Sequence, residues 1–293
     1  MKISVVTATY NREKLLPKLY ESLKENYKTF KDFEWVIQDD GSVDDTKKLV
    51  SKWKKEVDFT INYHYQENAG KMAAINNAME YVTGEIVMEI DSDDYIVPKG
   101  LKMVSDDYES LGDENIYGII YKRILGKKDT TVNPEMNGKI ITLFDIHNKY
   151  GFDFDMNLTF KTDIRKQYKY ELENNEKFVT EARMYYKMDQ DYDGMIFKDN
   201  DLIVGEYMED GYSKNINKMF KKYPYGYVKF YEEALTYIKK DTLSKRKLHF
   251  VKHYILFSYL TGRSVMECIK GAKKYKGLVM LLVIPGYIKS KRF

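Results

Sequence analysis

The chain has 293 residues, 43% hydrophobic and 32% charged, a composition that favours a folded globular protein over a disordered one. Its 48 lysine and arginine residues nearly balance 45 aspartate and glutamate residues, leaving a formal net charge of +3. We therefore do not expect nucleic acid as a partner. The single cysteine, Cys268, excludes an internal disulfide and a multi-cysteine metal site, and suits a reducing compartment.

The first residues enter an apolar run over positions 3–7 at once, with neither a long signal-type segment nor a small-residue cleavage site. No stretch approaches the roughly 20 apolar residues that cross a bilayer. We therefore expect a cytoplasmic protein without a membrane span.

The first 125 residues alternate short β-branched runs with amphipathic helical patterns, which is typical of an α/β fold with a mostly parallel sheet. This pattern predicts strands over residues 3–8, 34–38, 60–65 and 85–90, and helices over 13–26, 45–55 and 71–82. A helix after Pro98 and a strand over 116–121 follow. Each early strand leads into a polar loop, and open α/β sheets bind ligands beyond the carboxyl ends of their strands.

The pattern is irregular over residues 126–150 and supports no assignment there. From residue 225 onward, apolar residues recur at helical spacing, in one run over 227–238 and another over 248–260. We predict an α/β domain over residues 1–224, with halves 1–125 and 126–224, followed by a helical C-terminal region over 225–293.

Three carboxylates follow the fourth predicted strand within four positions, at Asp91, Asp93 and Asp94. Such crowding is electrostatically unfavourable without a cation. Because alternating residues of an extended chain point the same way, Asp91 and Asp93 can hold Mg²⁺ or Mn²⁺ against the oxygens of a diphosphate. The alternative is an acidic turn in which Asp93 or Asp94 caps the helix after Pro98.

A second acidic motif, residues 39–42, follows the second predicted strand and precedes a helix. A carboxylate such as that of Asp40 can accept a hydrogen bond from a nucleobase N–H group. The alternative is a turn in which Ser42 caps the helix.

Two further loops have residues suited to a nucleotide. Small residues around Thr7 would let the backbone approach a ligand, and Tyr10 could lie against a base, although an ordinary loop is equally consistent. Gly70 and Lys71 open a helix, whose N-terminus favours an anion such as phosphate. A solvated lysine is the alternative for Lys71.

These four motifs, in this order, resemble the nucleotide-sugar-binding half of the inverting family 2 glycosyltransferases with a GT-A fold. The resemblance covers roughly residues 1–125 and implies a Rossmann-like, mostly parallel sheet flanked by helices. It implies that Asp40 reads the base and that Thr7 and Tyr10 form walls of the nucleoside pocket. Lys71 would contact the phosphates of the donor.

Asp91 and Asp93 match the DxD motif of that family, whose carboxylates hold the metal and the donor, with Asp94 beside the sugar. The resemblance thus implies a metal-dependent, inverting transferase that uses Mn²⁺ or Mg²⁺. We expect a UDP-sugar as the donor, and a glycan or lipid-linked acceptor in cell-surface polysaccharide synthesis. Residues 1–125 would bind the donor and residues 126–224 the acceptor.

The family usually places an acidic pair at the start of a helix facing the acceptor, and here Glu181 is the candidate catalytic base. Ala182 stands where the second acid is usual, so the match is incomplete. The alternative is an ion pair between Glu181 and Arg183. Residues 206–213 resemble a loop near the acceptor or the diphosphate, and a turn at Gly211 also explains them.

An apolar run over residues 278–284 is too short to span a membrane. Lysine and arginine residues flank it: Lys270, Lys273, Lys274, Lys276, Lys289, Lys291 and Arg292. Such a segment could lie on an anionic membrane surface, which would place the protein on the inner face of the plasma membrane. An ordinary core helix explains the run equally well.

Two other functions remain open at this point. A sugar nucleotidyltransferase needs a similar sheet and metal carboxylates, but the glycine-rich basic loop after its first strand is missing. A non-catalytic signalling module could bind Mg²⁺ through Asp39, Asp40 and Asp91 and accept a phosphoryl group. The length of the chain and its downstream acidic site argue against that module.

Overall fold

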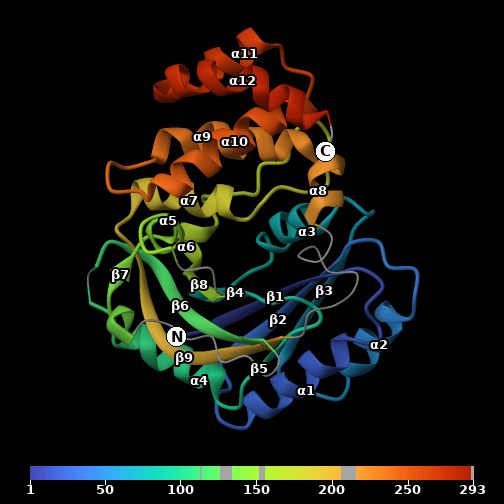
Figure 1. Cartoon of the computed structure of the whole chain (residues 1–293). Helices are drawn as coiled ribbons and strands as arrows, with labels where there is room; N and C mark the ends of the chain where they lie inside the picture. The colour runs from blue at the N-terminus through green and yellow to red at the C-terminus, as the bar shows by residue number, and fades with distance from the viewer. Residues whose placement is uncertain (113, 126–133, 152–155, 206–215, 292–293) are drawn as a thin grey trace. The chain divides into compact units, whose positions relative to one another are not determined.

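The computed structural model describes residues 1–112, 114–125, 134–151, 156–205 and 216–291. The chain divides into two compact units, and Figure 1 colours both along the sequence. The first unit comprises Met1–Ile141, Phe154–Lys169 and Tyr192–Met208, and the second comprises Thr142–Asp153, Tyr170–Asp191 and Glu209–Phe293. The domain boundary expected at residue 224 divides the chain differently, and it stays a prediction.

Within the described residues, the first unit is built on a nine-stranded sheet in the order β3-β2-β1-β4-β8-β6-β9-β5, with β7 paired to β9. The strands are β1 (Ile3–Thr9), β2 (Phe33–Asp39), β3 (Thr60–Tyr65), β4 (Ile86–Glu89), β5 (Tyr95–Ile96), β6 (Ile116–Leu125), β7 (Ile140–Ile141), β8 (Met156–Lys161) and β9 (Gly194–Gly205). The first four strands are parallel, whereas β8 is antiparallel to both β4 and β6. This sheet confirms the predicted α/β fold class.

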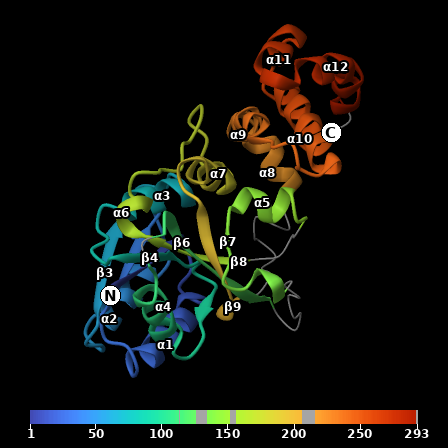
Figure 2. The ribbon, with the colours of Figure 1, turned by 90° about the vertical axis from the view of Figure 1, so that its left-hand side faces the viewer.

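Helices cover both faces of this sheet (Figures 1 and 2). The helices of this unit are α1 (Leu16–Tyr27), α2 (Thr46–Trp53), α3 (Lys71–Ala78), α4 (Gly100–Glu109), α6 (Thr162–Arg165) and the 3-10 helix η1 (Pro134–Met136). The helix α1 begins later than predicted, with Pro17 in its first turn, where the fixed φ of proline suits a helix start. The helix α3 packs on β1 and β2, on the face opposite α1 (Figure 1).

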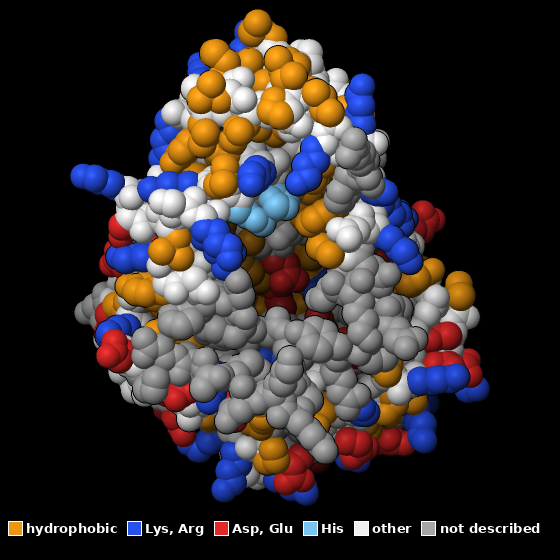
Figure 3. Space-filling model, in the orientation of Figure 1, with side chains coloured by type: hydrophobic (Ala, Val, Ile, Leu, Met, Phe, Trp, Pro, Cys, Tyr) orange, Lys and Arg blue, Asp and Glu red, His pale blue; other side chains and the backbone are white. Residues whose placement is uncertain are grey.

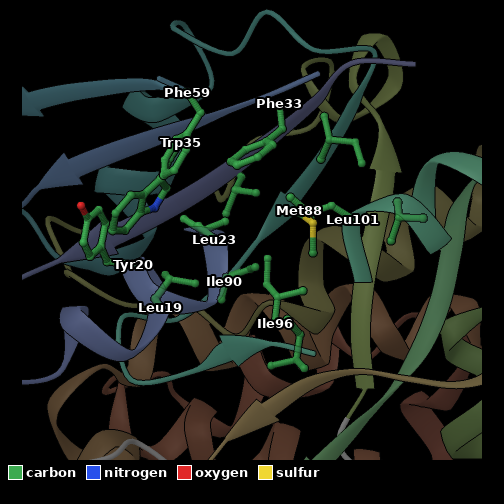
Figure 4. Close-up of a cluster of buried hydrophobic side chains, with 14 of the residues drawn as sticks. Leu19, Tyr20, Leu23, Phe33, Trp35, Phe59, Met88, Ile90, Ile96 and Leu101 are labelled. Atoms are coloured by element: carbon green, nitrogen blue, oxygen red, sulfur yellow. The ribbon is translucent and has the colours of Figure 1, made fainter. Parts of the chain in front are cut away.

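One hydrophobic core joins α1, α2 and α4 to the sheet (Figure 4). Trp35 of β2 is fully buried in it, and Tyr20 of α1 stacks on Trp53 of α2 with ring centroids 4.3 Å apart. Parallel strands covered on both faces read as nearly continuous apolar runs, and β2 is buried along its whole length. This packing holds in place the strand ends from which the polar loops emerge.

The second unit is helical in its described residues. Its helices are α5 (Leu143–Asn148), α7 (Ala182–Asp191), α8 (Ile216–Lys222), α9 (Pro224–Tyr237), α10 (Ser244–Leu260), α11 (Val265–Gly271), α12 (Lys276–Ser290) and the 3-10 helix η2 (Lys273–Tyr275). The predicted helical runs correspond to α9 and α10. These two helices join through aromatic side chains, for example Tyr227 and Phe257, whose rings stack at 4.8 Å. None of the helices described in the chain combines the length and the apolar character of a membrane span.

Candidate active site

Asp40 follows β2 and ties together the loop that leads from β3 to α3. Its buried carboxylate accepts four hydrogen bonds from that loop. The donors are Gln66 Nε2 at 2.8 Å, Asn68 Nδ2 at 3.0 Å, and the backbone N–H groups of Ala69 at 2.7 Å and Gly70 at 2.9 Å. Such charge-assisted bonds are strong, so this carboxylate holds the loop in one conformation beside α3. Its role in reading a base stays a prediction.

The loops after β1 and β2 are also bonded to each other. The Ser42 hydroxyl accepts the Asn11 N–H at 2.9 Å, and the Asn11 side-chain oxygen accepts the Val43 N–H at 2.8 Å. The helix α2 has Asp45 as its N-cap, without a side-chain capping bond among the described residues. The alternative in which Ser42 caps α2 is therefore wrong.

A glycine lets the loop after β2 lie close to the loop between β3 and α3. Gly41 has a φ of +88°, and a Cβ atom there would lie 2.9 Å from the Asn68 backbone nitrogen. A larger residue at this position would push the loop after β2 away from the loop between β3 and α3.

The residues predicted to line the nucleoside pocket differ in exposure. Tyr10 is 47% exposed, whereas Thr7 is fully buried, and its hydroxyl accepts the Trp35 indole N–H at 3.0 Å. Two residues further along β1, the Thr9 hydroxyl is buried without a hydrogen-bond partner in the described part of the chain. The predicted contacts of Thr7 and Tyr10 with a nucleoside stay predictions, and the Thr7 side chain has its own structural role.

Lys71 and Asp91, predicted from separate motifs, meet in the structure. The Lys71 ammonium lies 2.7 Å from an oxygen of the half-buried Asp91 carboxylate. Burial raises the pKa of Asp91, but Lys71, helped by Arg123 and Arg12, lowers it by more, so its pKa lies below the usual value. The charge of Asp91 is thus stabilised where the start of α3 meets the end of β4.

The other two carboxyl groups of the cluster, those of Asp93 and Asp94, have raised pKa values, which favours their neutral form. Burial and the charge of Asp91 raise the pKa of Asp93. The pKa of Asp94 is raised to about 7, because burial and the charges of Asp91 and Asp93 outweigh its ion pair with Arg123 at 2.6 Å. The helix α4 has Lys99 as its N-cap and, within the described chain, no side-chain capping bond. The alternative in which Asp93 or Asp94 caps this helix is therefore wrong.

These carboxylates suit a divalent cation in chemistry and in charge. Burial raises the pKa of Asp93 and Asp94 most, and repulsion from the neighbouring carboxylates raises it further. A bound cation would relieve that repulsion. No group of three or more aspartate, glutamate, histidine or cysteine side chains is gathered around one point in the described residues. A magnesium-type site commonly takes one or two carboxylates and completes its shell with substrate phosphates and water, and Asp91 with Asp93 fits that pattern.

Three residues of this site were not predicted from the sequence. Arg123 of β6 pairs with Asp94, and Gly205 of β9 leaves room for the pair, since a Cβ atom there would lie 2.4 Å from an Asp94 oxygen. Arg165, buried in the unit, donates to Glu89 at 2.7 Å and so anchors the end of β4 from which Asp91 emerges. All three come from strands or helices far along the chain, and nothing in their local sequence marks them.

Glu181 lies in the second unit, immediately before α7. Its carbonyl accepts the N–H groups of Met184 at 3.0 Å and Tyr185 at 3.2 Å, which begins the helix. The neighbouring Arg183 is buried and forms ion pairs with three glutamates, listed here with their distances: Glu233 at 2.7 Å, Glu173 at 2.9 Å and Glu171 at 3.0 Å. The assignment of Glu181 as the base stays a prediction. Residues 206–213 lie outside the described residues.

A mixed sheet with an acidic cluster at its strand ends is the arrangement expected of a glycosyltransferase with a GT-A fold. Residues 4–171, more than half of the chain, match glycosyl transferase family 2. The chain belongs to that family, as the four motifs predicted.

Relatives in sequence match only part of the chain. The chain is 34% identical over 108 residues to an uncharacterized glycosyltransferase of Mycoplasma pneumoniae. The matched residues make up 36% of this chain and 36% of that protein. It is 30% identical over 141 residues to the GalNAc(5)-diNAcBac-PP-undecaprenol beta-1,3-glucosyltransferase of Campylobacter jejuni, 47% of this chain and 43% of that protein. Each match therefore covers less than half of the relative's own length.

Solved structures share the fold across the chain. The structure of residues 1–349 of Staphylococcus aureus TarS in complex with UDP-GlcNAc aligns with a TM-score of 0.65 at 18% identity, over 100% of this chain and 90% of that chain. The mannosyltransferase PcManGT of Pyrobaculum calidifontis, in complex with GDP-Man and Mn²⁺, aligns with a TM-score of 0.58 at 16% identity, over 97% and 75% of the two chains. At these identities the likeness concerns the fold.

Proposed function

We propose that this glycosyltransferase moves a sugar from a UDP-sugar to an acceptor hydroxyl and inverts the anomeric carbon. The observation that carries the proposal is the ion pair between Lys71 and Asp91, beside the loop that Asp40 holds. A cation at a helix start and carboxylates at a strand end suit the diphosphate and metal of a nucleotide-sugar. The UDP-GlcNAc complex of the TarS structure agrees with UDP as the nucleotide.

On the donor side, Asp40, Thr7 and Tyr10 would surround the nucleoside, and Lys71 would bind the diphosphate. Asp94 would lie beside the sugar. Asp91 and Asp93 would hold Mn²⁺ or Mg²⁺, which when bound neutralises charge on the departing diphosphate. Lys71 would stabilise the same charge from the start of α3.

On the acceptor side, Glu181 would remove the proton from the attacking hydroxyl as that oxygen bonds to the anomeric carbon. The attack comes from the face opposite the nucleotide, so one displacement inverts the configuration. The oxygen–carbon bond of the product forms as the bond to the diphosphate breaks, and the proton ends on Glu181.

We propose a cell-surface glycan or a lipid-linked glycan as the acceptor. One relative is a transferase for an undecaprenol-linked glycan, and another, TarS, is a poly(ribitol-phosphate) beta-N-acetylglucosaminyltransferase. Such synthesis would place the protein in the cytoplasm, at the inner face of the plasma membrane. Residues 1–224 would form the catalytic domain, and residues 225–293 a helical region added to it.

The test is thermal unfolding of the full chain with UDP, GDP or CMP, each with and without Mn²⁺. A nucleotide present at 100 times its Kd stabilises a protein by about 2.7 kcal/mol, a shift of several degrees in Tm for a chain of this length. We expect UDP with Mn²⁺ to raise Tm and UDP alone to raise it less. If no nucleotide changes Tm under any condition, the proposal is wrong. Family membership already favours a transferase over the nucleotidyltransferase and the signalling module.

A further inference from the structure

The last helix, α12, has two apolar faces, and only one of them is packed. Val279 and Val283 are buried, and Gly286 sits so close to Ile255 of α10 that a Cβ atom would lie 2.6 Å from it. These positions recur at helical spacing along one side. One side of α12 therefore packs as a core helix does, against α10 of its own unit.

The opposite side of α12 is apolar and exposed. Leu281 is 76% exposed, Ile284 62% and Ile288 59%, at the i, i+3 and i+7 positions of one stripe. Met266 of α11, in the same unit, is 60% exposed. Figure 3 shows hydrophobic side chains gathered over α11 and α12. We call the stripe and Met266 the α11–α12 apolar face; no described residue covers it, and contiguous exposed apolar surface usually marks an interaction site.

Positive charge borders this face. Six lysines between the end of α11 and the residue after α12 are exposed: Lys270, Lys273, Lys274, Lys276, Lys289 and Lys291. Between residues 263 and 291 the one acidic residue is Glu267, and its carboxylate already accepts hydrogen bonds from the Ser264 N–H at 2.8 Å and the Ser264 hydroxyl at 2.7 Å. Six lysines against one glutamate leave this border with a net positive charge.

We infer that the α11–α12 apolar face binds the surface of an anionic lipid bilayer, with α12 lying in the plane of the interface. Lysines are depleted at protein–protein interfaces, whereas apolar helices edged with lysine are typical of anionic lipid surfaces. The helix has 15 residues, or about 22 Å at 1.5 Å per residue, short of the roughly 30 Å hydrocarbon layer. It can therefore lie in the interface but cannot cross it.

The binding does not depend on the proposed reaction, so each can fail without the other. The test is flotation of the full chain with vesicles of phosphatidylcholine alone or mixed with phosphatidylglycerol. We expect binding to the mixed vesicles only, weakened about tenfold or more by the double variant Leu281→Gln with Ile284→Gln, because apolar burial is lost. The matched control is Ile140→Gln, which replaces an apolar residue that is 42% exposed in the other unit and should bind as the wild type does.

A second set of variants in the same flotation experiment tests the contribution of the lysines. Lys289→Glu with Lys291→Glu should weaken binding about tenfold or more, since each basic residue near an anionic surface contributes about 1 kcal/mol. Lys47→Glu with Lys55→Glu makes the same change at exposed sites in the first unit and should have little effect. Equal binding to both kinds of vesicle, or no binding to either, would overturn the inference. So would sedimentation velocity that shows a dimer dissociated by the Leu281 and Ile284 changes, because a second copy would then occupy the face.

Discussion

The ammonium group of Lys71 lies 2.7 Å from the carboxylate of Asp91 and joins the first residue of α3 to the end of β4. The two residues are 20 positions apart, and each belongs to a separate motif that predicts a donor-binding residue. Their contact places a cation and an anion on the same edge of the sheet, where nucleotides bind in open α/β folds.

Lys71→Met removes this cation. We expect kcat/KM for a UDP-sugar to fall by about 10²- to 10³-fold, the loss typical when one stabilising charge or donor is removed from a developing anion. Steady-state kinetics measure the effect. Lys102→Met breaks another lysine–aspartate contact, that with Asp106 at 2.6 Å on the surface of α4, and should leave kcat/KM unchanged; an equal fall in both variants would contradict the role of Lys71.

Asp40→Asn should loosen the loop before α3. An amide offers one acceptor oxygen to four donors and turns its own N–H groups toward some of them, so we expect about 2 kcal/mol less stability and weaker UDP binding. Urea denaturation and calorimetric titration measure the two losses. Asp45→Asn, at a side chain that is 73% exposed, should change stability by less than about 0.5 kcal/mol.

Gly205→Ala tests the space around the Asp94 ion pair. The new methyl group would meet the Asp94 and Arg123 side chains at 2.4 and 2.6 Å, and must displace them. Misplacement by about 1 Å in an active site can lower the rate about 10²-fold, so kcat should fall while circular dichroism stays that of a folded protein. Gly277→Ala, with open space around its Cβ position, should keep full activity. Activity retained in Gly205→Ala would remove Asp94 from the site.

Glu181→Gln should lower kcat by about 10²- to 10⁴-fold, the usual contribution of a general base, and spare UDP affinity. Turnover measured at saturating donor, with UDP titration alongside, separates the two effects. As a control, Glu267→Gln changes a glutamate in the first turn of α11, where glutamine can also complete the capping box, and should leave turnover unchanged. Normal turnover in Glu181→Gln would eliminate this residue as the base.

The lowered pKa of Glu34 leads to a prediction of how the stability of the fold depends on pH. Burial raises its pKa, but hydrogen bonds from the Ser4 hydroxyl and from Thr83, with the charge of Lys2, lower it by more. A carboxyl with a lowered pKa stabilises the fold above its unfolded value of about 4.3, and this stability is lost as pH falls through the folded value. Glu34→Gln should therefore be about 2 kcal/mol less stable than the wild type at pH 7.

Urea denaturation at a series of pH values measures this difference, which should narrow as the pH falls below 4. The matched control is Glu21→Gln, whose side chain is 64% exposed; it should differ little from the wild type at any pH. A difference for Glu34→Gln that stays constant with pH would show that its charge contributes nothing.

The early strands could be predicted because local signals agree with the fold there. The strand over residues 60–65 has the predicted bounds. Asp40 and Asp91 stand where apolar strands give way to polar loops, and Lys71 is the first residue of α3. Residues 140–148 form only the short elements β7 and α5. Elements of two and six residues are too short to show a period, which explains the irregular pattern there.

The ion pairs of the site could not be predicted. Arg123 reaches Asp94 across 29 positions, and Arg165 reaches Glu89 across 76. Both contacts depend on β8 entering the sheet between β4 and β6. The packing of the whole unit decides which strands lie side by side. The hydrophobic pattern of a single strand does not show which strand will pair with it.

The most direct test of the account is a crystal of the full chain soaked with UDP and Mn²⁺ and measured at the manganese absorption edge. We predict an anomalous peak bound by Asp91 and Asp93, with the diphosphate against Lys71. Manganese bound elsewhere, or UDP bound with these three side chains turned away from it, would contradict the account.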